Sequence, residues 1–133
     1  MDIVIKAAAV ADYCPHEVAE QNIKKATDDA LTIVLDKNPD ILKKLGELKT
    51  RQFLVGFAAE TQNLLANATE KIKKKNLDMI VANDVTIAGA GFNYDTNVVK
   101  FLFPNGEVKS LDKMSKLEVA QALLNEVKAA RNK

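Results

Sequence analysis

The chain has 133 residues, of which 47% are hydrophobic and 28% are charged, and this composition excludes a wholly disordered protein. Nineteen basic and eighteen acidic side chains leave a formal charge of +1, so the overall charge does not favour a nucleic-acid-binding or membrane-surface protein. A single cysteine and the lack of a long apolar run predict one cytoplasmic domain over residues 1–133, without a disulfide or a membrane span.

A buried strand and an antiparallel excursion are predicted first. Residues 3–11 are mostly β-branched or small, a pattern typical of a strand that is covered on both faces. Because this strand begins almost at the first residue, we expect further strands of the same sheet to precede Met1. After a break at residues 14–16, residues 24–25 and 31–35 predict two short strands joined by a polar turn.

Two helices then alternate with two more buried strands. Asn38 as the N-cap and Pro39 in the first turn predict the start of one helix, and Thr61 predicts the start of the next. Residues 53–59 and 77–81 are apolar runs that predict the strands. Each helix is expected to bury one apolar face, formed by Ile41, Leu42, Leu45 and Leu48 in the first and by Leu65, Ala68 and Ile72 in the second.

A β-hairpin and a final helix complete the predicted elements. Residues 98–103 and 108–111 predict the two strands of the hairpin, with Pro-Asn-Gly at residues 104–106 as its turn. Ser115 followed by Glu118 predicts a capping box at the start of the helix. The helix is expected to face the core with Leu117, Ala120, Leu124 and Val127.

These elements define the fold class. The alternation of strands and helices up to residue 81 implies parallel strands joined by right-handed crossovers. We therefore predict an α/β fold: a three-layer Rossmann-like domain with a mostly parallel sheet, an antiparallel hairpin excursion and a C-terminal β-hairpin plus helix. The N-terminal strands of this sheet are expected to be missing from the sequence.

Small residues followed by a polar residue end three of the predicted strands, at residues 8–12, 56–60 and 82–84. Ligands of open α/β sheets bind beyond the carboxyl ends of the strands, so these segments are candidates for ligand contacts, unless they only pack under helices. Lys71 and Lys75 share a helical face, where two ammonium groups repel each other unless an anion lies between them. The pair is an argument for a phosphate site, and a solvated helix end is the alternative.

Other chemistry has less support in the sequence. Cys14 and His16 are two residues apart, but no oxyanion motif accompanies them as evidence for thiol catalysis. One histidine without a neighbouring carboxylate cluster predicts no metal site made by protein side chains. The glycine fingerprints of dinucleotide and P-loop sites are missing from the sequence. The residues alone thus predict a small α/β domain with a candidate phosphate site, and they do not name a reaction.

Five segments occur in a specific order along the chain. They read AAAVADY at 7–13, IKK at 23–25, KNPDI at 37–41, VGFAAET at 55–61 and KNLDMIVANDV at 75–85. Together they resemble the C-terminal portion of bacterial phosphopantothenate-cysteine ligase, the CTP-using half of the bifunctional coenzyme A biosynthesis flavoprotein. The resemblance continues at residues 91–93 and 95–97 and so covers nearly the whole chain.

The resemblance implies a two-step ligation. CTP activates the carboxylate of 4'-phosphopantothenate as an acyl-cytidylate with loss of pyrophosphate, and the amine of cysteine then attacks to form the amide and release CMP. The resemblance also implies Mg²⁺ bound with the triphosphate, a homodimer formed through residues 14–36, and a flavin-dependent decarboxylase domain fused in the full-length protein.

Site residues follow from the resemblance by position. Those implied to bind CTP are Ala8, Ala9, Val10, Asp12, Pro39, Asp40, Ile41, Leu42, Phe57, Lys71 and Lys75. Asn22 stands where the family has a lysine tied to nucleotide activation, and its amide cannot supply that charge. The upstream segment in which the family carries an Asn, an Arg and Ser-Ser-Gly-Lys-Met-Gly has no match in this chain.

These departures lead us to expect that the isolated chain is inactive as a ligase. Two alternatives to a ligase portion remain at this point. One is a noncatalytic nucleotide-binding or dimerisation module, and the other is a structural α/β domain whose lysine face has no ligand.

Overall fold

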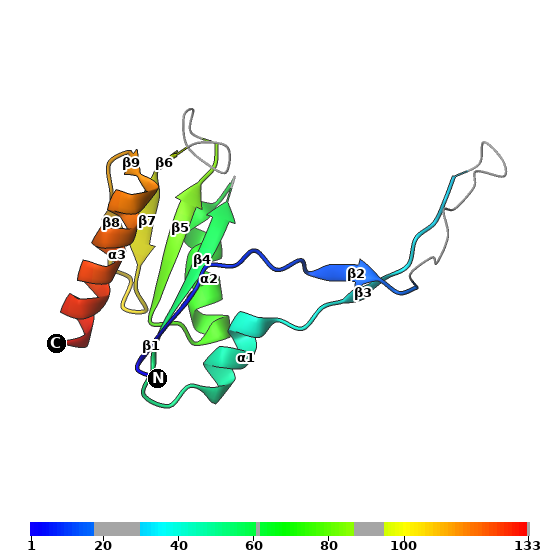
Figure 1. The fold of residues 1–133 in the computed structure, drawn as a ribbon, viewed down its shortest axis with the longest axis horizontal. Coiled ribbons are helices and arrows are strands. Elements are labelled where there is room, and N and C mark those ends of the chain that lie inside the picture. Colours follow the sequence, from blue (N-terminus) through cyan, green and yellow to red (C-terminus); the bar gives the residue numbers. More distant parts are fainter. Residues whose placement is uncertain (18–29, 61, 87–94, 133) are drawn as a thin grey trace. The chain divides into compact units, whose positions relative to one another are not determined.

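The computed structural model describes residues 1–17, 30–60, 62–86 and 95–132, and it divides the chain into two compact units (Figure 1). The larger unit consists of Met1–Ala7 and Leu42–Lys133, and the smaller unit is Ala8–Ile41. We describe each unit by itself, and the assignment of residues 1–133 to one domain stays a prediction. The predicted strand at residues 24–25 and the predicted helix cap Thr61 lie outside the described residues.

The elements alternate between strands and helices along the larger unit. They are β1 (Ile3–Lys6), α1 (Ile41–Leu48, which begins at the last residue of the smaller unit), β4 (Phe53–Glu60), α2 (Leu64–Lys75), β5 (Met79–Asp84), β6 (Thr96–Asn97), β7 (Val99–Leu102), β8 (Val108–Ser110), β9 (Met114–Ser115) and α3 (Lys116–Arg131). The smaller unit contains β2 (Tyr13–Pro15) and β3 (Leu35–Lys37).

Five strands form the sheet of the larger unit, in the order β1-β4-β5-β7-β8. β1 and β5 both pair with β4 in parallel, which confirms the alternation inferred from the sequence. β7 pairs with β5 and with β8 in antiparallel fashion, and the β7–β8 pair is the predicted C-terminal hairpin. β6 and β9 form a separate two-stranded ladder that precedes α3.

Side chains alternate between the two faces of this sheet and pack into two separate cores. One core joins α1 and α2 to the face that carries Leu54, Ala58, Ile80, Ala82 and Leu102. The other joins α3 to the face that carries Val55, Met79, Val81, Val99 and Phe101. Helices therefore cover both faces, which confirms the three-layer, Rossmann-like α/β architecture.

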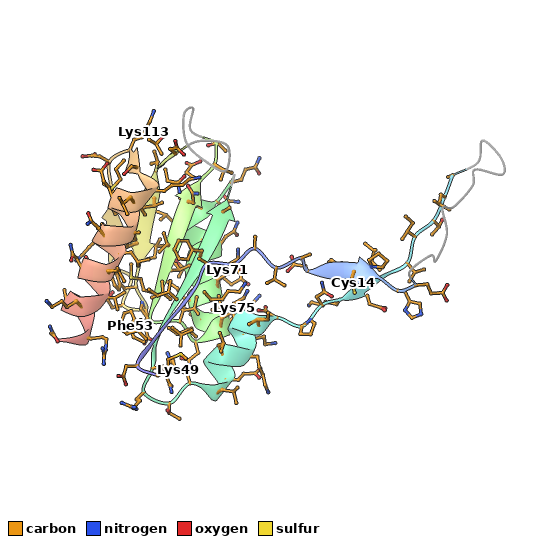
Figure 2. All side chains as sticks on the ribbon, viewed as in Figure 1. Cys14, Lys49, Phe53, Lys71, Lys75 and Lys113 are labelled. Atoms are coloured by element: carbon orange, nitrogen blue, oxygen red, sulfur yellow. The ribbon has the colours of Figure 1, made fainter. Side chains whose placement is uncertain are left out.

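Polar contacts tie the end of α1 to the strands beside it. Lys49 Nζ donates to Asp78 Oδ2 at 3.0 Å and to the carbonyl oxygen of Asn76 at 2.7 Å. The backbone N–H of Leu54 donates to the same Asp78 oxygen at 2.8 Å, and Asn76 Nδ2 donates to the carbonyl oxygen of Gly46 at 3.0 Å. The connection from α1 to β4 and the connection from α2 to β5 are thus held together by the same few groups, which include the side chain of Lys49 (Figure 2).

The first predicted strand was too long. β1 ends at Lys6, and residues 7–11 are exposed. Only Ile3–Lys6 have register partners on β4, and the following alanines offer little apolar area to hold them in the sheet.

The strands of the antiparallel excursion were also placed wrongly. Residues 31–34 are not in a strand, although the sequence predicts one there. The partner of β3 is β2, which includes Cys14 and Pro15 of the segment that the sequence predicts to be a break. The ladder is extended at its two ends by the N–H of His16 bonded to the carbonyl of Val34 and by the N–H of Asn38 bonded to the carbonyl of Asp12. These main-chain bonds do not depend on the apolar pattern from which the strands were predicted.

Helix faces were predicted with mixed success. The capping box of Ser115 and Glu118 is confirmed. In α2, Ala68 and Ile72 are buried as expected, whereas Leu65 is 43% exposed. In α1, Leu42 is buried as expected, whereas Ile41 and Leu48 are 45% and 65% exposed.

The predicted face of α3 was wrong apart from Val127. The buried residues are Val119, Leu123 and Val127, whereas Leu117 and Leu124 are 73% and 58% exposed. The helix follows β9 without a linker, so the β6–β9 ladder and the cap set its rotation, and its second apolar stripe remains outside.

Candidate functional site

The carboxyl ends of β4 and β5 bring two of the three sequence-predicted ligand segments side by side. In register, Phe57 pairs with Val81, Ala59 with Asn83, and Glu60 with Asp84. Phe57 is 38% exposed although it lies in a strand of the sheet interior. A large aromatic side chain that stays partly open at this edge is suited to contact a flat ligand.

Asn83 lies in the predicted ligand segment 82–84, but the sequence analysis did not single it out as a site residue. Its Oδ1 atom is buried, and no donor among the described residues lies within hydrogen-bonding distance of it. A buried carbonyl oxygen without a donor costs about 1–3 kcal/mol, and such groups concentrate at functional sites. The sequence signal for this residue is an asparagine at the end of an apolar strand, followed by an aspartate. Residue type alone could not show that the Asn83 oxygen lacks a hydrogen-bond donor.

Asp84 follows on the same strand and is held by Thr86. The Thr86 hydroxyl and backbone N–H donate to Asp84 Oδ1 at 2.6 Å and 2.9 Å. These bonds, the hydroxyl first and the backbone N–H second, lower the pKa of Asp84 below its usual value. The carboxylate is thus ionised at neutral pH and fixed in a turn at the edge where Asn83 lies.

Lys71 and Lys75 lie one turn apart on α2, in the basic last turns of the helix (Figure 2). Both are half-buried, whereas Lys73 and Lys74 are exposed, and Lys74 forms an ion pair with Glu70. Lys71 and Lys75 thus lie on the side of α2 that adjoins the buried Ala68 and Ile72, and this difference in exposure follows from the helical period.

Asn38 bonds the two segments of the smaller unit that carry predicted nucleotide contacts. The Asn38 side-chain amide donates to the carbonyl oxygen of Ala11 at 2.8 Å, and its backbone N–H donates to the carbonyl oxygen of Asp12 at 2.7 Å. These bonds join the segment before β2 to the segment that begins α1. The predicted contact residues on these two segments, all exposed, are Ala8, Ala9, Val10, Asp12, Pro39, Asp40 and Ile41.

Asn38 is consequently not the N-cap that the sequence predicted. α1 begins at Ile41, three residues later, and the Asn38 amide is used for a contact across 27 positions of the chain. The side chain of Leu42, another predicted contact, is 6% exposed and packs in the core, which leaves its backbone as the part available to a ligand.

Three further candidates have different outcomes. Asn22, at the position of the family lysine, lies outside the described residues. Cys14 is an exposed thiol, and His16 Nδ1 lies 2.7 Å from Asp36 Oδ2 on the same ribbon. No group of three or more His, Cys, Asp or Glu side chains suited to a metal ion occurs among residues 1–17, 30–60, 62–86 and 95–132. In the same ranges, no helix is long and apolar enough to cross a bilayer.

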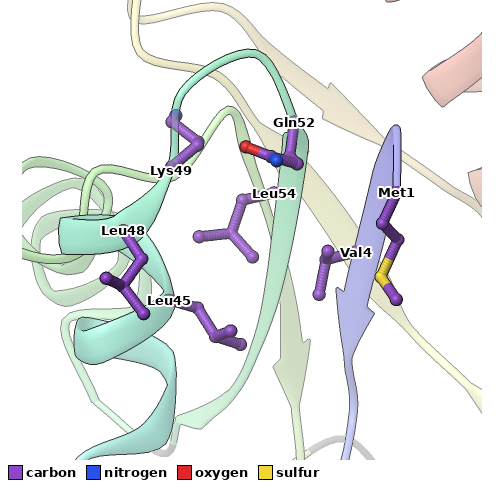
Figure 3. A pocket seen from close by; sticks show the side chains of 7 residues that line it. All are labelled: Met1, Val4, Leu45, Leu48, Lys49, Gln52 and Leu54. Carbon is purple, nitrogen blue, oxygen red and sulfur yellow. The ribbon is translucent and has the colours of Figure 1, made fainter.

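A groove of about 200 Å³ lies at the opposite end of the parallel strands (Figure 3). It is lined mainly by apolar side chains from β1, β4 and α1: Met1, Val4, Leu45, Leu48, Lys49, Gln52 and Leu54. It contains none of the predicted site residues, and it is at the amino ends of the strands rather than at the carboxyl ends where ligands of such sheets bind. We therefore do not assign it to the candidate site.

Comparison with known proteins matches nearly the whole chain to part of two longer proteins. The coenzyme A biosynthesis bifunctional protein CoaBC of Bacillus subtilis is 52% identical over 128 residues, which are 96% of this chain and 31% of that protein. CoaBC of Haemophilus influenzae is 53% identical over 126 residues, 94% of this chain and 31% of that protein. The chain thus spans about a third of the length of these two relatives.

A solved structure and a family model agree with these relatives. The crystal structure of the C-terminal domain of CoaBC matches with a TM-score of 0.74 and 43% identity, over 98% of this chain and 57% of that one. The model of the DNA/pantothenate metabolism flavoprotein C-terminal domain matches residues 1–130. The resemblance drawn from the five segments is confirmed, and the chain belongs to the family of DNA/pantothenate metabolism flavoprotein C-terminal domains.

Proposed function

We propose that this chain supplies the CTP-binding portion of a phosphopantothenate-cysteine ligase in coenzyme A biosynthesis. In this reaction CTP and 4'-phosphopantothenate form an acyl-cytidylate and pyrophosphate, and cysteine then displaces CMP to give the amide. The single observation that supports the proposal most is the match of 96% of the chain to a coenzyme A biosynthesis protein at 52% identity. The donor-free oxygen of Asn83 fits a ligand at the edge that the match includes.

We assign roles within the proposed site from the family resemblance and from the chemistry of each group. Residues 8–12 and 39–41 are exposed, and backbone N–H and C=O groups on these segments would distinguish the amino group and ring acceptors of cytosine. Phe57 would pack against the nucleotide, and Lys71 and Lys75 would face the triphosphate, which binds Mg²⁺ as a complex. Protein side chains need not hold the metal in this arrangement. We place the reaction in the cytoplasm, in a full-length protein that includes a fused decarboxylase domain.

The first test is nucleotide preference. Isothermal titration in the presence of Mg²⁺ is expected to give a higher affinity for CTP than for ATP, because backbone groups around residues 8–12 and 39–41 read the base. Lys71→Ala and Lys75→Ala should each weaken CTP binding about tenfold, and CMP binding less, because their charges face the outer phosphates. Lys74→Ala is the matched control, since this exposed lysine pairs with Glu70. Equal affinities for CTP and ATP, or equal effects of the three variants, would refute the assignment.

Ligase activity should be undetectable in the 133-residue chain alone. Acyl transfer needs both substrates aligned, and loss of alignment removes most of the roughly 7–11 kcal/mol that proximity contributes to lowering the barrier. Asn22→Lys should strengthen CTP binding without restoring turnover, and pyrophosphate release dependent on phosphopantothenate is the measurement. Robust pyrophosphate release from the unmodified chain would show that the roles given to position 22 and to the upstream segment are wrong.

A homodimer through the smaller unit is the second part of the proposal, and a dimerisation module without ligase activity is the alternative function that it favours. β2 and β3 form a two-stranded ribbon, which is marginally stable by itself in water. Large apolar side chains of the ribbon and of the residues that precede β3 are each more than half exposed: Tyr13, Leu31, Ile33, Val34 and Leu35. Such a surface is more stable when a second copy covers it.

Light scattering at micromolar concentration should therefore give the mass of a dimer. Ile33→Lys should shift the protein to monomer, because it places a charge in the apolar surface, whereas Leu117→Lys on the equally exposed outer face of α3 should not. A monomer across the micromolar range, or dissociation by both variants, would rule out this interface. A dimer that binds no CTP would support the noncatalytic alternative.

A further inference from the structure

We infer that Asn38 is a positioning residue that presets the nucleotide-reading backbone by holding residues 11–12 against the segment that begins α1. The inference rests on the proposed CTP site, because it assigns the base contacts to the segments that Asn38 joins. Asn38 itself is half-buried behind exposed neighbours, and we assign it no contact with the nucleotide.

Two hydrogen bonds from one residue to successive carbonyls carry the inference. The backbone N–H of Asn38 bonds to Asp12, one step beyond the Tyr13–Lys37 pair at the end of the β2–β3 ladder. A backbone N–H of any residue except proline could make this bond. The second bond, from Asn38 Nδ2 to the carbonyl of Ala11 at 2.8 Å, needs a side-chain amide of this length.

Local sequence explains why Asn38 is available for this contact. Pro39 restricts the residue before it to extended conformations, so Asn38 continues the line of β3 instead of entering the helix. Because α1 begins only at Ile41, the Asn38 amide is not engaged as a helix cap. Asparagine often caps a helix, but the Asn38 side chain instead donates a hydrogen bond to Ala11, 27 positions earlier in the chain.

Preorganisation gives this contact a functional consequence. Residues 7–9 and 11 are alanines, whose side chains have no polar group to fix the backbone. If backbone groups of this segment read cytosine, their relative positions must be set before binding, or the cost of ordering them reduces the affinity. The hydrogen bond from the Asn38 side-chain amide fixes the backbone carbonyl of Ala11, next to Asp12, which is the charged residue of the segment.

Asn38→Asp tests the inference because it keeps the size of the side chain and removes its donor. We expect CTP affinity to fall about five- to tenfold and the affinity for inorganic tripolyphosphate to stay within twofold, since Asn38 acts on base recognition alone. Asn38→Ala should give the same pattern without added charge. Asn105→Asp, in the exposed β7–β8 turn, is the charge control and should leave both affinities unchanged.

The results separate this inference from the proposed function. A CTP affinity of the Asn38 variants within twofold of the parent, or an equal loss for tripolyphosphate, would overturn the positioning role while leaving the CTP site intact. If the parent chain binds no CTP, the proposed function fails, and amide hydrogen exchange still decides the positioning role. The backbone N–H of residue 38 should exchange at least fivefold faster in Asn38→Asp than in the parent. Unchanged exchange of this N–H would overturn the inference.

Discussion

Replacement of Gly46 by alanine is expected to lower the free energy of unfolding by about 3 kcal/mol or more. A Cβ atom at this position would lie 1.8 Å from the carbonyl oxygen of Lys75 and 2.8 Å from its carbonyl carbon. Both atoms belong to the backbone at the end of α2, so no side-chain rotation can relieve the clash. The helices would have to separate, and the bond from Asn76 Nδ2 to the Gly46 carbonyl would be lost with them.

Gly56→Ala is the matched control for this prediction. Its added Cβ would meet Leu42 Cδ2 at 2.7 Å and Leu77 Cδ1 at 3.0 Å, which are the ends of flexible side chains. A smaller loss of about 1 kcal/mol is expected there. Urea unfolding followed by circular dichroism measures both values. If Gly46→Ala unfolds within about 1 kcal/mol of the parent, the close approach of α1 to α2 is not as described, because helix propensity alone would favour alanine.

Asn83→Leu is expected to separate stability from binding. Leucine is of similar size and removes a buried oxygen for which the described residues provide no donor, so the free energy of unfolding should stay unchanged or rise by up to about 1 kcal/mol. CTP affinity should fall at least about tenfold, because the ligand would lose an acceptor that the fold leaves open to it.

Asn105→Leu should show the reverse pattern. Asn105 Oδ1 accepts the N–H of Glu107 in the hairpin turn, so its loss should weaken folding and leave CTP binding unchanged. Titration calorimetry and urea unfolding of both variants make the comparison. A fall in stability with unchanged CTP affinity for Asn83→Leu would mean that its oxygen has a structural role.

Much of the architecture could be predicted because it depends on local pattern. Apolar runs gave β4 and β5, and the Ser115–Glu118 spacing gave the start of α3. The parallel order followed from the alternation of strands with helices, since parallel strands need a crossover. These features require only residue type and spacing, so one sequence contains enough information to place them.

The features that could not be predicted depend on contacts distant in sequence. α3 carries two apolar stripes, and only the β6–β9 ladder decides that Val119 and Leu123 face the sheet instead of Leu117 and Leu124. Asn38 fits an N-cap by residue type, and its partner Ala11 is 27 positions away. The missing donor of Asn83 is a property of its whole surroundings. Pattern analysis therefore reached the segments of the site but not the groups that organise it.

The outer edge of β1 offers a second way for two molecules to associate, which bears on any measurement of the protein's mass in solution. Among the described strands, β1 is at one end of the sheet, and its Ile-Val-Ile sequence has neither a proline nor a charge before Lys6. Strand edges of this kind can pair with another molecule and join two sheets into one. Association through β1 would persist in Ile33→Lys, and together with the proposed interface of the smaller unit it would let the unmodified protein grow beyond a dimer as concentration rises. Sedimentation over a range of concentrations can thus distinguish a closed dimer from open-ended strand pairing.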